Sequence, residues 1–371
     1  MLLLLALLSF QAKPIALDLF EAGKDGYAIY RIPTVAVTPK GTVLVACEAR
    51  KTRSDWGEID LLARRSTDGG KTFEPPFNIA PLEGQFERNP AALKQKLGSP
   101  DWRTINNPVL IAGRDGTVHF LYCVEYARVF YRRSTDEGKT WSKAVEITAA
   151  LEPLRKKYPW LVVATGPGHG LKTRKGRLIV PVWLSTGTGR GAHRPSIVST
   201  LASDDGGKTW RAGEIVADGT EPIVDPNEST AAELADGRIL LNIRTPAKER
   251  RRAFSISKDG LTGWSKPTFD EGLPDPVCMG SLLNVGKTLY FSNLNTTSKR
   301  QNLTIKRSDD GGKSWVEHHV VTKGPSAYSD LAASPDGQVL WCFYERGEGK
   351  ELYRWLTLLR LPLKEGIRPG E

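Results

Sequence analysis

Long apolar segments are almost absent from this sequence of 371 residues. The only unbroken one is MLLLLALLSFQA at the N-terminus, which is too short to cross a bilayer stably. The composition is not extreme either, since 40% of the residues are hydrophobic and 25% are charged. These values exclude a polytopic membrane protein, a disordered chain, a collagen and a coiled coil.

Cysteine is scarce as well. The four cysteines mostly lie in apolar, strand-like runs such as LVACEA and LWCFY, where a thiol serves as a small hydrophobic side chain. They are Cys47, Cys123, Cys278 and Cys342. Their spacing matches neither a metal site nor a disulfide framework. A chain of this length can bury a large core without such staples.

The N-terminal apolar run resembles the hydrophobic region of a secretory signal. It predicts a signal peptide over residues 1–16, cleaved between Ala12 and Ala16, and export to the periplasm or the extracellular space. The mature domain would then be residues 17–371, monomeric and without stable membrane insertion. A charged segment before the run and a clean cleavage motif are missing, so a misassigned start codon is the alternative.

Positive charge exceeds negative charge: 52 Lys and Arg residues stand against 42 Asp and Glu, a net charge of +10. Such an excess could favour nucleic acid, anionic lipid or an acidic substrate. The only dense basic cluster, residues 248–252, contains Glu249 and lies between strand signals. We therefore expect a solvated loop there and no nucleic-acid partner.

Glycine and proline, in contrast, are plentiful, and two turn patterns recur. The first is Ser-x-Asp-x-Gly-x-x-aromatic, in which Ser and Asp side chains bind turn backbone and Gly supplies a positive φ. It occurs at Ser66/Asp68/Gly70/Phe73, Ser134/Asp136/Gly138/Trp141, Ser203/Asp205/Gly207/Trp210 and Ser308/Asp310/Gly312/Trp315. A decayed copy, Ser257/Asp259/Trp264, has Leu261 in place of Gly. The ligand spacing of a calcium-binding EF-hand loop is missing.

The second pattern is a turn glycine followed by a short apolar strand. It begins at Gly41, Gly116, Gly176, Gly237, Gly286 and Gly337. The spacing between successive turn glycines suits a four-stranded sheet with its loops. The sequence therefore predicts an all-β fold, a six-bladed β-propeller of four-stranded antiparallel blades. We expect the strand DGYAIYRIP to complete the last blade, and residues 84–100 and 150–158 to be helical insertions. The glycine-rich pieces TGPGHG and GTGRG lack the context of a nucleotide-binding loop.

Polar residues interrupt these apolar strands at one common position. Seven residues after each turn glycine stand Glu48, Cys123, Trp183, Arg244, Asn293 and Tyr344, with Arg50 and Glu345 nearby. A charged residue at the end of an apolar strand is costly unless it is paired or binds a ligand. Convergence at one mouth of the propeller explains the pattern, and a ring of internal ion pairs is the alternative.

Several segments together resemble the exo-α-sialidases, or neuraminidases. They are YRIP (30–33), the Asp boxes, GPGHG (166–170), NES…ELADGRILLNIR (227–244), KRQNL (299–303) and AYSDL (327–331). The resemblance covers roughly residues 26–360. It implies a substrate-binding trio of Arg31, Arg244 and Arg300. Arg50 would contact a hydroxyl group of the sugar ring, and Glu345 would hold Arg31 in place. The resemblance also implies Tyr328 as the nucleophile, Glu228 as its partner and Asp55 as the acid/base.

The resemblance implies retaining hydrolysis of terminal sialic acid from glycoconjugates, without a cofactor or an obligatory metal. Paired, permanently charged arginines suit the carboxylate of sialic acid, and a neutral phenol avoids the repulsion that a carboxylate nucleophile would meet. As an acid, Asp55 would need a raised pKa, which the neighbouring Trp56 could provide. The alternatives are a hydrolase or trans-glycosidase for a related ulosonic acid such as Kdn or Kdo, and a non-catalytic propeller that binds glycan or protein.

Overall fold

The computed structural model describes residues 13–82, 84 and 86–363. Most of the predicted signal peptide, at 1–12, lies outside these residues, so the signal peptide and export stay predictions. Within the described ranges, no helix combines the length and the apolar character that a membrane span needs.

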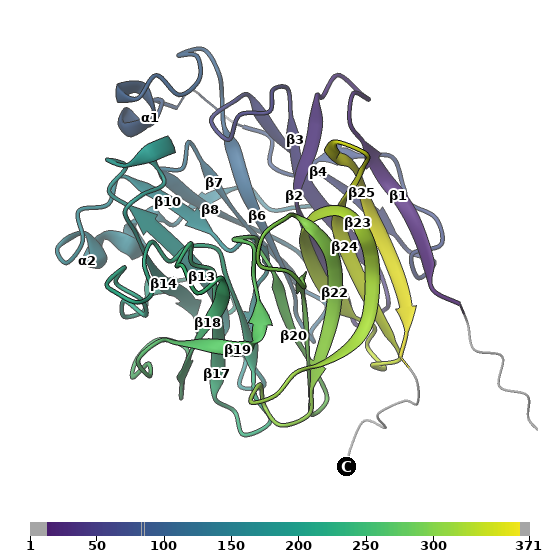
Figure 1. The fold of residues 1–371 in the computed structure, drawn as a ribbon. Coiled ribbons are helices and arrows are strands. Elements are labelled where there is room, and N and C mark those ends of the chain that lie inside the picture. The colour runs from purple at the N-terminus through teal and green to yellow at the C-terminus, as the bar shows by residue number, and fades with distance from the viewer. Residues whose placement is uncertain (1–12, 83, 85, 364–371) are drawn as a thin grey trace, which may run out of the picture.

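The protein is all-β, as predicted, and its strands form five antiparallel sheets with one short parallel pairing, β11 on β6 (Figure 1). The first contains β2 (Ile29–Val37), β3 (Val43–Arg50), β4 (Ile59–Ser66) and β5 (Phe77–Asn78). The second contains β6 (Ile105–Ala112), β7 (Val118–Val124), β8 (Arg128–Ser134), β9 (Val145–Glu146) and β11 (Gly168–His169). The third contains β10 (Val162–Thr165), β12 (Leu171–Lys172), β13 (Leu178–Ser185), β14 (Ser196–Ser203) and β15 (Arg211–Ala212).

The fourth sheet contains β16 (Ser229–Glu233), β17 (Ile239–Ile243), β18 (Arg251–Ser257) and β19 (Thr268–Pro274). The fifth has seven strands: β20 (Ser281–Val285), β21 (Thr288–Leu294), β22 (Gln301–Ser308), β23 (Val316–Ala333), β24 (Val339–Glu348), β25 (Glu351–Pro362) and β1 (Ile15–Glu21). Because β23 is 18 residues long, its first part pairs with β22 and its last part with β24. The seven-stranded sheet therefore consists of two four-stranded units that share β23.

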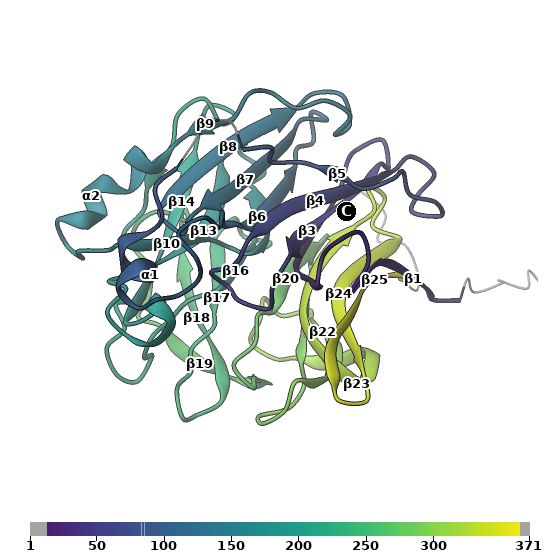
Figure 2. The same ribbon diagram turned by 90° about the horizontal axis from the view of Figure 1, so that it is seen from above.

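The strand that pairs with the C-terminal strand is not the predicted one. The segment YRIP lies in β2, which pairs with β3, whereas β1 pairs with β25 and lies beside it in Figures 1 and 2. Burial explains the difference: nearly all of β2 is buried between β6 and β23, while β1 buries only Leu19 and Phe20 well. The exposed outer position beside β25 needs only a few buried residues, whereas β2 is buried along nearly its whole length.

Each Asp box forms the predicted turn. In the first, Ser66 donates to Asp68 at 2.8 Å, and the Gly70 amide donates to Ser66 at 2.8 Å. In the decayed copy, Gly260 takes the place of the missing glycine one residue earlier, with φ +76°, and its amide donates to Ser257. The turn is thus shortened by one residue but keeps its glycine.

The box glycines also join neighbouring sheets. A Cβ on Gly138, Gly207, Gly260 or Gly312 would lie within 3.0 Å of a side chain of the preceding sheet. These neighbours are Leu44, Tyr131, Ile179 and Leu240, and Gly70 stands in the same relation to Trp341 of β24. The first sheet therefore packs against the last one, and a buried cluster containing Val45, Trp341 and Phe343 fills the space between them.

The two predicted insertions contain short helices. α1 spans Pro90–Lys94, and a 3₁₀ helix at Thr148–Leu151 continues into α2 at Glu152–Arg155. A further 3₁₀ turn lies at Arg190–Ala192. In both ribbon views α1 and α2 lie at the periphery, far from β25 (Figures 1 and 2).

The prediction for residues 248–252 was wrong at its C-terminal end. Arg251 and Arg252 begin β18, and Arg252 is fully buried. The charge of Arg252 faces Asp275. Asp275 follows β19 and is therefore distant from Arg252 in sequence, so the pair was not visible in the local pattern. The four cysteines are buried and free.

Candidate active site

Residues from all parts of the chain line one cavity of about 510 Å³. Seven of the eight predicted site residues lie in its wall: Arg31, Arg50, Asp55, Glu228, Arg244, Arg300 and Tyr328. The eighth, Glu345, lies behind Arg31. The structure therefore brings the whole predicted set together.

Tyr328 and Glu228 form a close pair at the centre of the site. The phenol oxygen lies 2.6 and 2.7 Å from the two carboxylate oxygens of Glu228. Tyr328 is only 5% exposed, and burial raises the pKa of its phenol well above the ordinary value. Arg244 opposes this shift and Glu228 adds to it. The phenol is thus protonated in the empty site and already bound to a proton acceptor.

Three arginines surround the ring of Tyr328. The Cζ atoms of Arg31, Arg300 and Arg244 lie 4.9, 5.5 and 5.9 Å from the ring centroid. Arginines that approach the same ring from β2, from the segment before β22 and from the end of β17 can share one small anionic ligand. This geometry is the one that the predicted substrate-binding trio requires.

Arg31 is held by a carboxylate that also organises the backbone. Its Nε and Nη2 donate to Glu345 at 2.8 and 3.3 Å, and the amides of Ile32 and Tyr328 donate to the same carboxylate at 3.0 Å. Ile32 has a φ of 58° within a β-bulge of β2. Bulges re-aim side chains, and this one directs Arg31 into the cavity while the Ile32 amide meets Glu345.

Arg244 and Arg300 are held in part by main-chain oxygen. Arg244 Nη1 contacts Glu228 and lies 3.1 Å from the Tyr328 hydroxyl. Arg300 Nη1 donates to the Tyr353 hydroxyl at 2.9 Å. The Nη2 groups of both arginines donate to the carbonyl of Val277, at 3.0 and 3.2 Å.

Asp55 lies beside Arg50 in the wall of the cavity. Arg50 Nη1 donates to Asp55 at 2.7 Å, and Arg50 Nε donates to the buried Glu48 at 2.7 Å. Enclosure in the cavity opposes ionisation, but the charge of Arg50, helped by His193, outweighs it and holds the pKa of Asp55 below its usual range. The expected rise in the pKa of Asp55 is therefore wrong for the empty site. Trp56 cannot cause it, because its indole is buried and donates to Gly191.

Sequence reasoning missed several residues of the wall. Tyr126, Trp183 and His193 form an aromatic side of the cavity, with His193 5.0 and 5.3 Å from the other two rings, and Tyr353 stacks on Arg31 at 4.1 Å. Of the six strand positions seven residues after a turn glycine, Trp183 and Arg244 line the cavity, whereas Glu48, Cys123, Asn293 and Tyr344 do not. The common offset marked Trp183, but the other missed residues carried no comparable signal.

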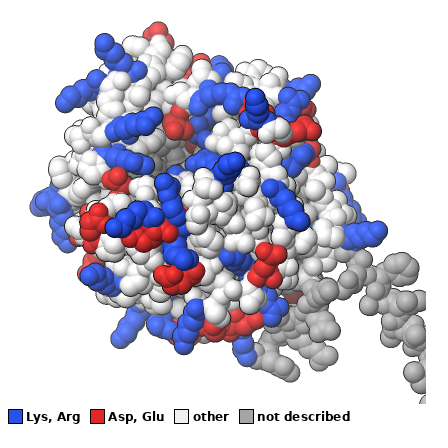
Figure 3. Space-filling view, viewed as in Figure 1, with Lys and Arg blue, Asp and Glu red and all other residues white. Residues whose placement is uncertain are grey.

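Charge elsewhere is dispersed. On the face in Figure 3, basic and acidic side chains are interspersed rather than gathered into one basic patch. Within the described part of the chain, no three His, Cys, Asp or Glu side chains group as metal ligands would.

Comparison with known proteins points to one family. The model of the BNR repeat-like domain matches residues 89–340. The chain is 34% identical to a protein named sialidase from Micromonospora viridifaciens, over 90% of this chain and 52% of that protein. It is also 34% identical to a sialidase of Bacteroides fragilis, over 81% of this chain and 56% of the relative. The chain thus spans about half the length of these relatives. Among solved structures, the Hadza microbial sialidase Hz136 superposes with a TM-score of 0.76 at 25% identity, covering 94% of this chain and 69% of that one.

Proposed function

Since the chain belongs to the BNR-repeat family of sialidases, we propose that it is a retaining exo-α-sialidase that releases terminal sialic acid from glycoconjugates. The observation that carries the proposal is the Tyr328–Glu228 pair inside a ring of three arginines. The remaining site residues fit roles around that pair.

Recognition starts with the carboxylate on the anomeric carbon of the sugar. Arg31, Arg244 and Arg300 bind it, because guanidinium groups stay charged and form paired hydrogen bonds with carboxylates. Glu345 offsets the repulsion among them by neutralising Arg31. The bound carboxylate then lies above the Tyr328 ring and fixes the anomeric carbon next to the phenol oxygen.

Tyr328 attacks the anomeric carbon, and Glu228 takes its proton at the same time. A neutral phenol suits a substrate that carries its own negative charge next to the reacting carbon. The surrounding arginines stabilise the phenolate character that develops during attack, although the ground-state pKa is high. This attack inverts the anomeric carbon and links it to Tyr328. Water then displaces the tyrosine with a second inversion, which restores the original configuration.

Asp55 protonates the leaving glycosidic oxygen and later activates the water. In the empty site Arg50 keeps this carboxyl ionised. Binding of an anionic sugar adds negative charge near Asp55 and compensates the arginines, and both effects raise the pKa of a neighbouring carboxyl. The acid is therefore formed as substrate enters, and turnover is favoured in mildly acidic solution.

We propose further that the four-stranded units form a six-bladed propeller with the site at its axis. Four sheets and the two units of the seven-stranded sheet make six repeats. The packing of each box glycine on the preceding sheet, and of the first on the last, supports a closed ring. Export and a monomeric state remain proposals from the sequence.

The test is hydrolysis of three fluorogenic glycosides, of sialic acid, Kdn and Kdo, by wild type and Tyr328→Phe. We expect turnover of the sialoside, first release of the α-anomer, and a fall in kcat of at least about a thousandfold in the variant, because the covalent route is lost. Tyr290→Phe, a buried tyrosine outside the cavity, is the matched control and should keep wild-type activity.

Other outcomes separate the alternatives. Preference for the Kdn or Kdo glycoside would assign a related ulosonic acid, and a transfer product with added lactose would assign trans-glycosidase activity. If the protein hydrolysed none of the three glycosides at mildly acidic or neutral pH, the alternative of a non-catalytic propeller that binds glycan or protein would be supported.

A further inference from the structure

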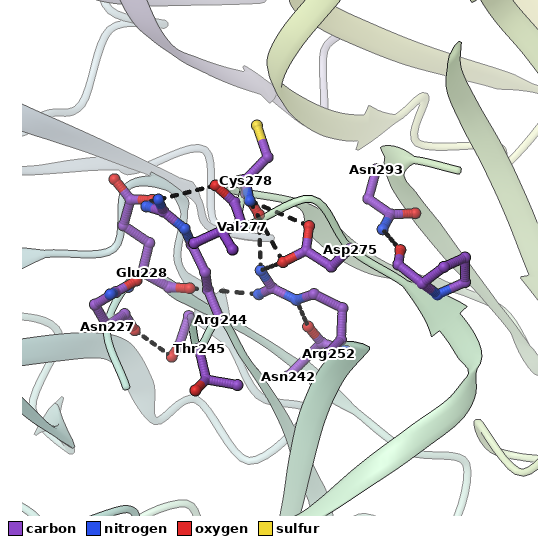
Figure 4. Close-up of polar contacts among 12 residues, drawn as sticks. Asn227, Glu228, Asn242, Arg244, Thr245, Arg252, Asp275, Val277, Cys278 and Asn293 are labelled. Atoms are coloured by element: carbon purple, nitrogen blue, oxygen red, sulfur yellow. Dashed lines mark hydrogen bonds and ion pairs between the residues drawn. The ribbon is translucent and has the colours of Figure 1, made fainter. Parts of the chain in front are cut away.

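One main-chain oxygen separates two of the three arginines. The carbonyl of Val277 accepts from Arg244 Nη2 at 3.0 Å and from Arg300 Nη2 at 3.2 Å. Figure 4 shows Val277 between Arg244 and the pair formed by Arg252 and Asp275. We propose that the turn Asp275–Cys278, held by Arg252, is a positioning device that fixes the spacing of Arg244 and Arg300 for a carboxylate ligand.

The two arginines need such a device because they repel each other in the empty site. Arg31 has Glu345 and Arg244 has Glu228 as carboxylate partners. Arg300 forms no ion pair with any described residue, and the hydrogen bonds that hold its guanidinium come from the Tyr353 hydroxyl and the Val277 carbonyl. A carbonyl dipole pointing between two cations attracts both and restricts their distance.

The direction of this carbonyl is set on the other side of its peptide plane. The carbonyl of Val277 and the amide of Cys278 belong to one planar trans unit, in which they point in opposite directions. The Cys278 amide lies 3.2 and 3.4 Å from the carboxylate oxygens of Asp275. With the amide held towards Asp275, the carbonyl must point towards the arginines.

Arg252 holds the turn in place from within the fold. This fully buried side chain lies 3.6 Å from Asp275, and it donates to Asn242 at 2.7 Å and to the Cys278 carbonyl at 2.9 Å. A further bond of 3.3 Å reaches the main-chain oxygen of Glu228. One buried arginine thereby connects the turn to Glu228, the partner of the nucleophile, which directly precedes β16.

Backbone strain at Val277 also indicates that the turn Asp275–Cys278 is held in place by its surroundings. The φ of Val277 is 65°, a region that β-branched residues rarely occupy. Such strain persists only where the surroundings enforce it, and it concentrates at functional sites. Here the enforcing contacts are those of Asp275 and Arg252 with the residue that follows.

The test uses Arg252→Lys, because removing Asp275 would leave a buried arginine without a counterion and endanger folding. Lysine keeps the charge but cannot reach Asn242, Cys278 and Asp275 together. The substrate carboxylate is bound in both ground and transition state, so the loss should appear in KM. We expect KM for the sialoside to rise about tenfold, or about 1.4 kcal/mol, and kcat to fall by a smaller factor, because the displaced arginines also stabilise the phenolate character that develops during attack.

The control for Arg252→Lys is Arg64→Lys. Arg64 also donates to several main-chain carbonyls, those of Leu19, Phe73 and Glu74, but it lies outside the cavity. Thermal stability should fall less than in Arg252→Lys, because Arg64 is only half-buried, and KM should be unchanged. A merely structural role for Arg252 would lower thermal stability in Arg252→Lys and leave its KM unchanged as well.

The variant Val277→Gly tests whether the fixed direction of the carbonyl at residue 277 matters for substrate binding. Glycine adopts this φ without strain, so the variant should unfold at the wild-type temperature or above it. The freer peptide should turn more easily, and KM should rise severalfold. An unchanged KM in either Arg252→Lys or Val277→Gly overturns the proposal.

The inference rests on the proposed function, and a binding measurement separates the two. Calorimetric titration with the 2,3-unsaturated analogue of sialic acid uses the same arginines without turnover. A wild-type protein that binds the analogue but hydrolyses no sialoside contradicts only the proposed function. Equal affinity of wild type and Arg252→Lys contradicts only the positioning role, and absence of binding to the wild type contradicts both.

Discussion

Glu345 holds both Arg31 and the backbone around it in place, so the stability of the site depends on this residue. This fully buried carboxylate accepts four hydrogen bonds, from Arg31 twice and from the amides of Ile32 and Tyr328. In Glu345→Gln one acceptor oxygen becomes a donor that faces these donors, and Arg31 loses its counterion. Because breaking a buried pair costs about 3–5 kcal/mol, we expect a loss of that size in the free energy of unfolding, measured in urea, together with a higher KM. Glu58→Gln, which breaks the exposed pair with Lys51, should change stability by less than about 1 kcal/mol. Equal stability of the two variants would contradict this account.

The same scale shows what the sequence could reveal of the site. Seven of the eight predicted residues line one cavity and Glu345 lies behind it, and five of the eight could be identified because they lie in the distinctive motifs YRIP, NES, NIR, KRQNL and AYSDL. Tyr353 and His193 lie in segments without a motif, and nothing local marks them. Val277 contributes an oxygen that every residue possesses, so its role depends on backbone direction and leaves no trace in residue type. The pKa of Asp55 depends on Arg50 being 2.7 Å away, a distance that sequence does not contain.

At the scale of strands and turns, local patterns were reliable and pairing partners were not. The glycines that precede β3, β7, β13, β17, β21 and β24 all have positive φ, as the turn pattern predicted. An early strand was expected to complete the last sheet, but the segment predicted for it lies in β2, and β1 pairs with β25 instead. The continuous β23 contains Gly324 and Pro325, so its residue types do not mark it as one strand. Both features depend on contacts between distant segments.

The box turns yield a prediction about how the sheets adhere. Gly138 has a φ of 77°, and an added Cβ would lie 2.7 Å from both Cδ atoms of Leu44 in the neighbouring sheet. Gly138→Ala therefore combines backbone strain with a clash, and we expect the free energy of unfolding to fall by about 2–4 kcal/mol. Gly69→Ala is the matched control, because Gly69 has a similar φ of 70° but open space around its Cα. Its loss should be near 1 kcal/mol, from backbone strain alone. If chemical denaturation gave both variants the same stability, the glycine would not be needed for packing between sheets.

Across the whole molecule, a small polar cluster ties several sheets together. Asp330 of β23 accepts from His169 of β11 at 2.7 Å, from Ser281 of β20 at 2.8 Å and from the amide of Val35 of β2 at 2.9 Å. These residues do not line the active-site cavity. Two of the sheets that deliver the arginines, those of Arg31 and Arg300, thus converge on one buried carboxylate.

This cluster gives the molecule a distinctive pH dependence. Burial opposes protonation of His169, but the charge of Asp330 outweighs it and raises the pKa of the imidazole above its ordinary value. The folded state then binds this proton more tightly than the unfolded state, so the stabilisation is complete below about pH 6.5 and is lost as pH rises through the raised pKa. The pKa values of His119, His193, His318 and His319 are lowered by burial, so each of these four adds stability, rather than loses it, as pH rises through the ordinary imidazole pKa of about 6.5. We expect the difference in unfolding free energy between wild type and His169→Gln to shrink as pH rises above about 6.5 into alkaline solution, while His319→Gln shows no such decrease. A difference that stays constant over this range in urea titrations would mean that His169 is neutral in the folded protein, and that the sheets are joined here by hydrogen bonds without charge.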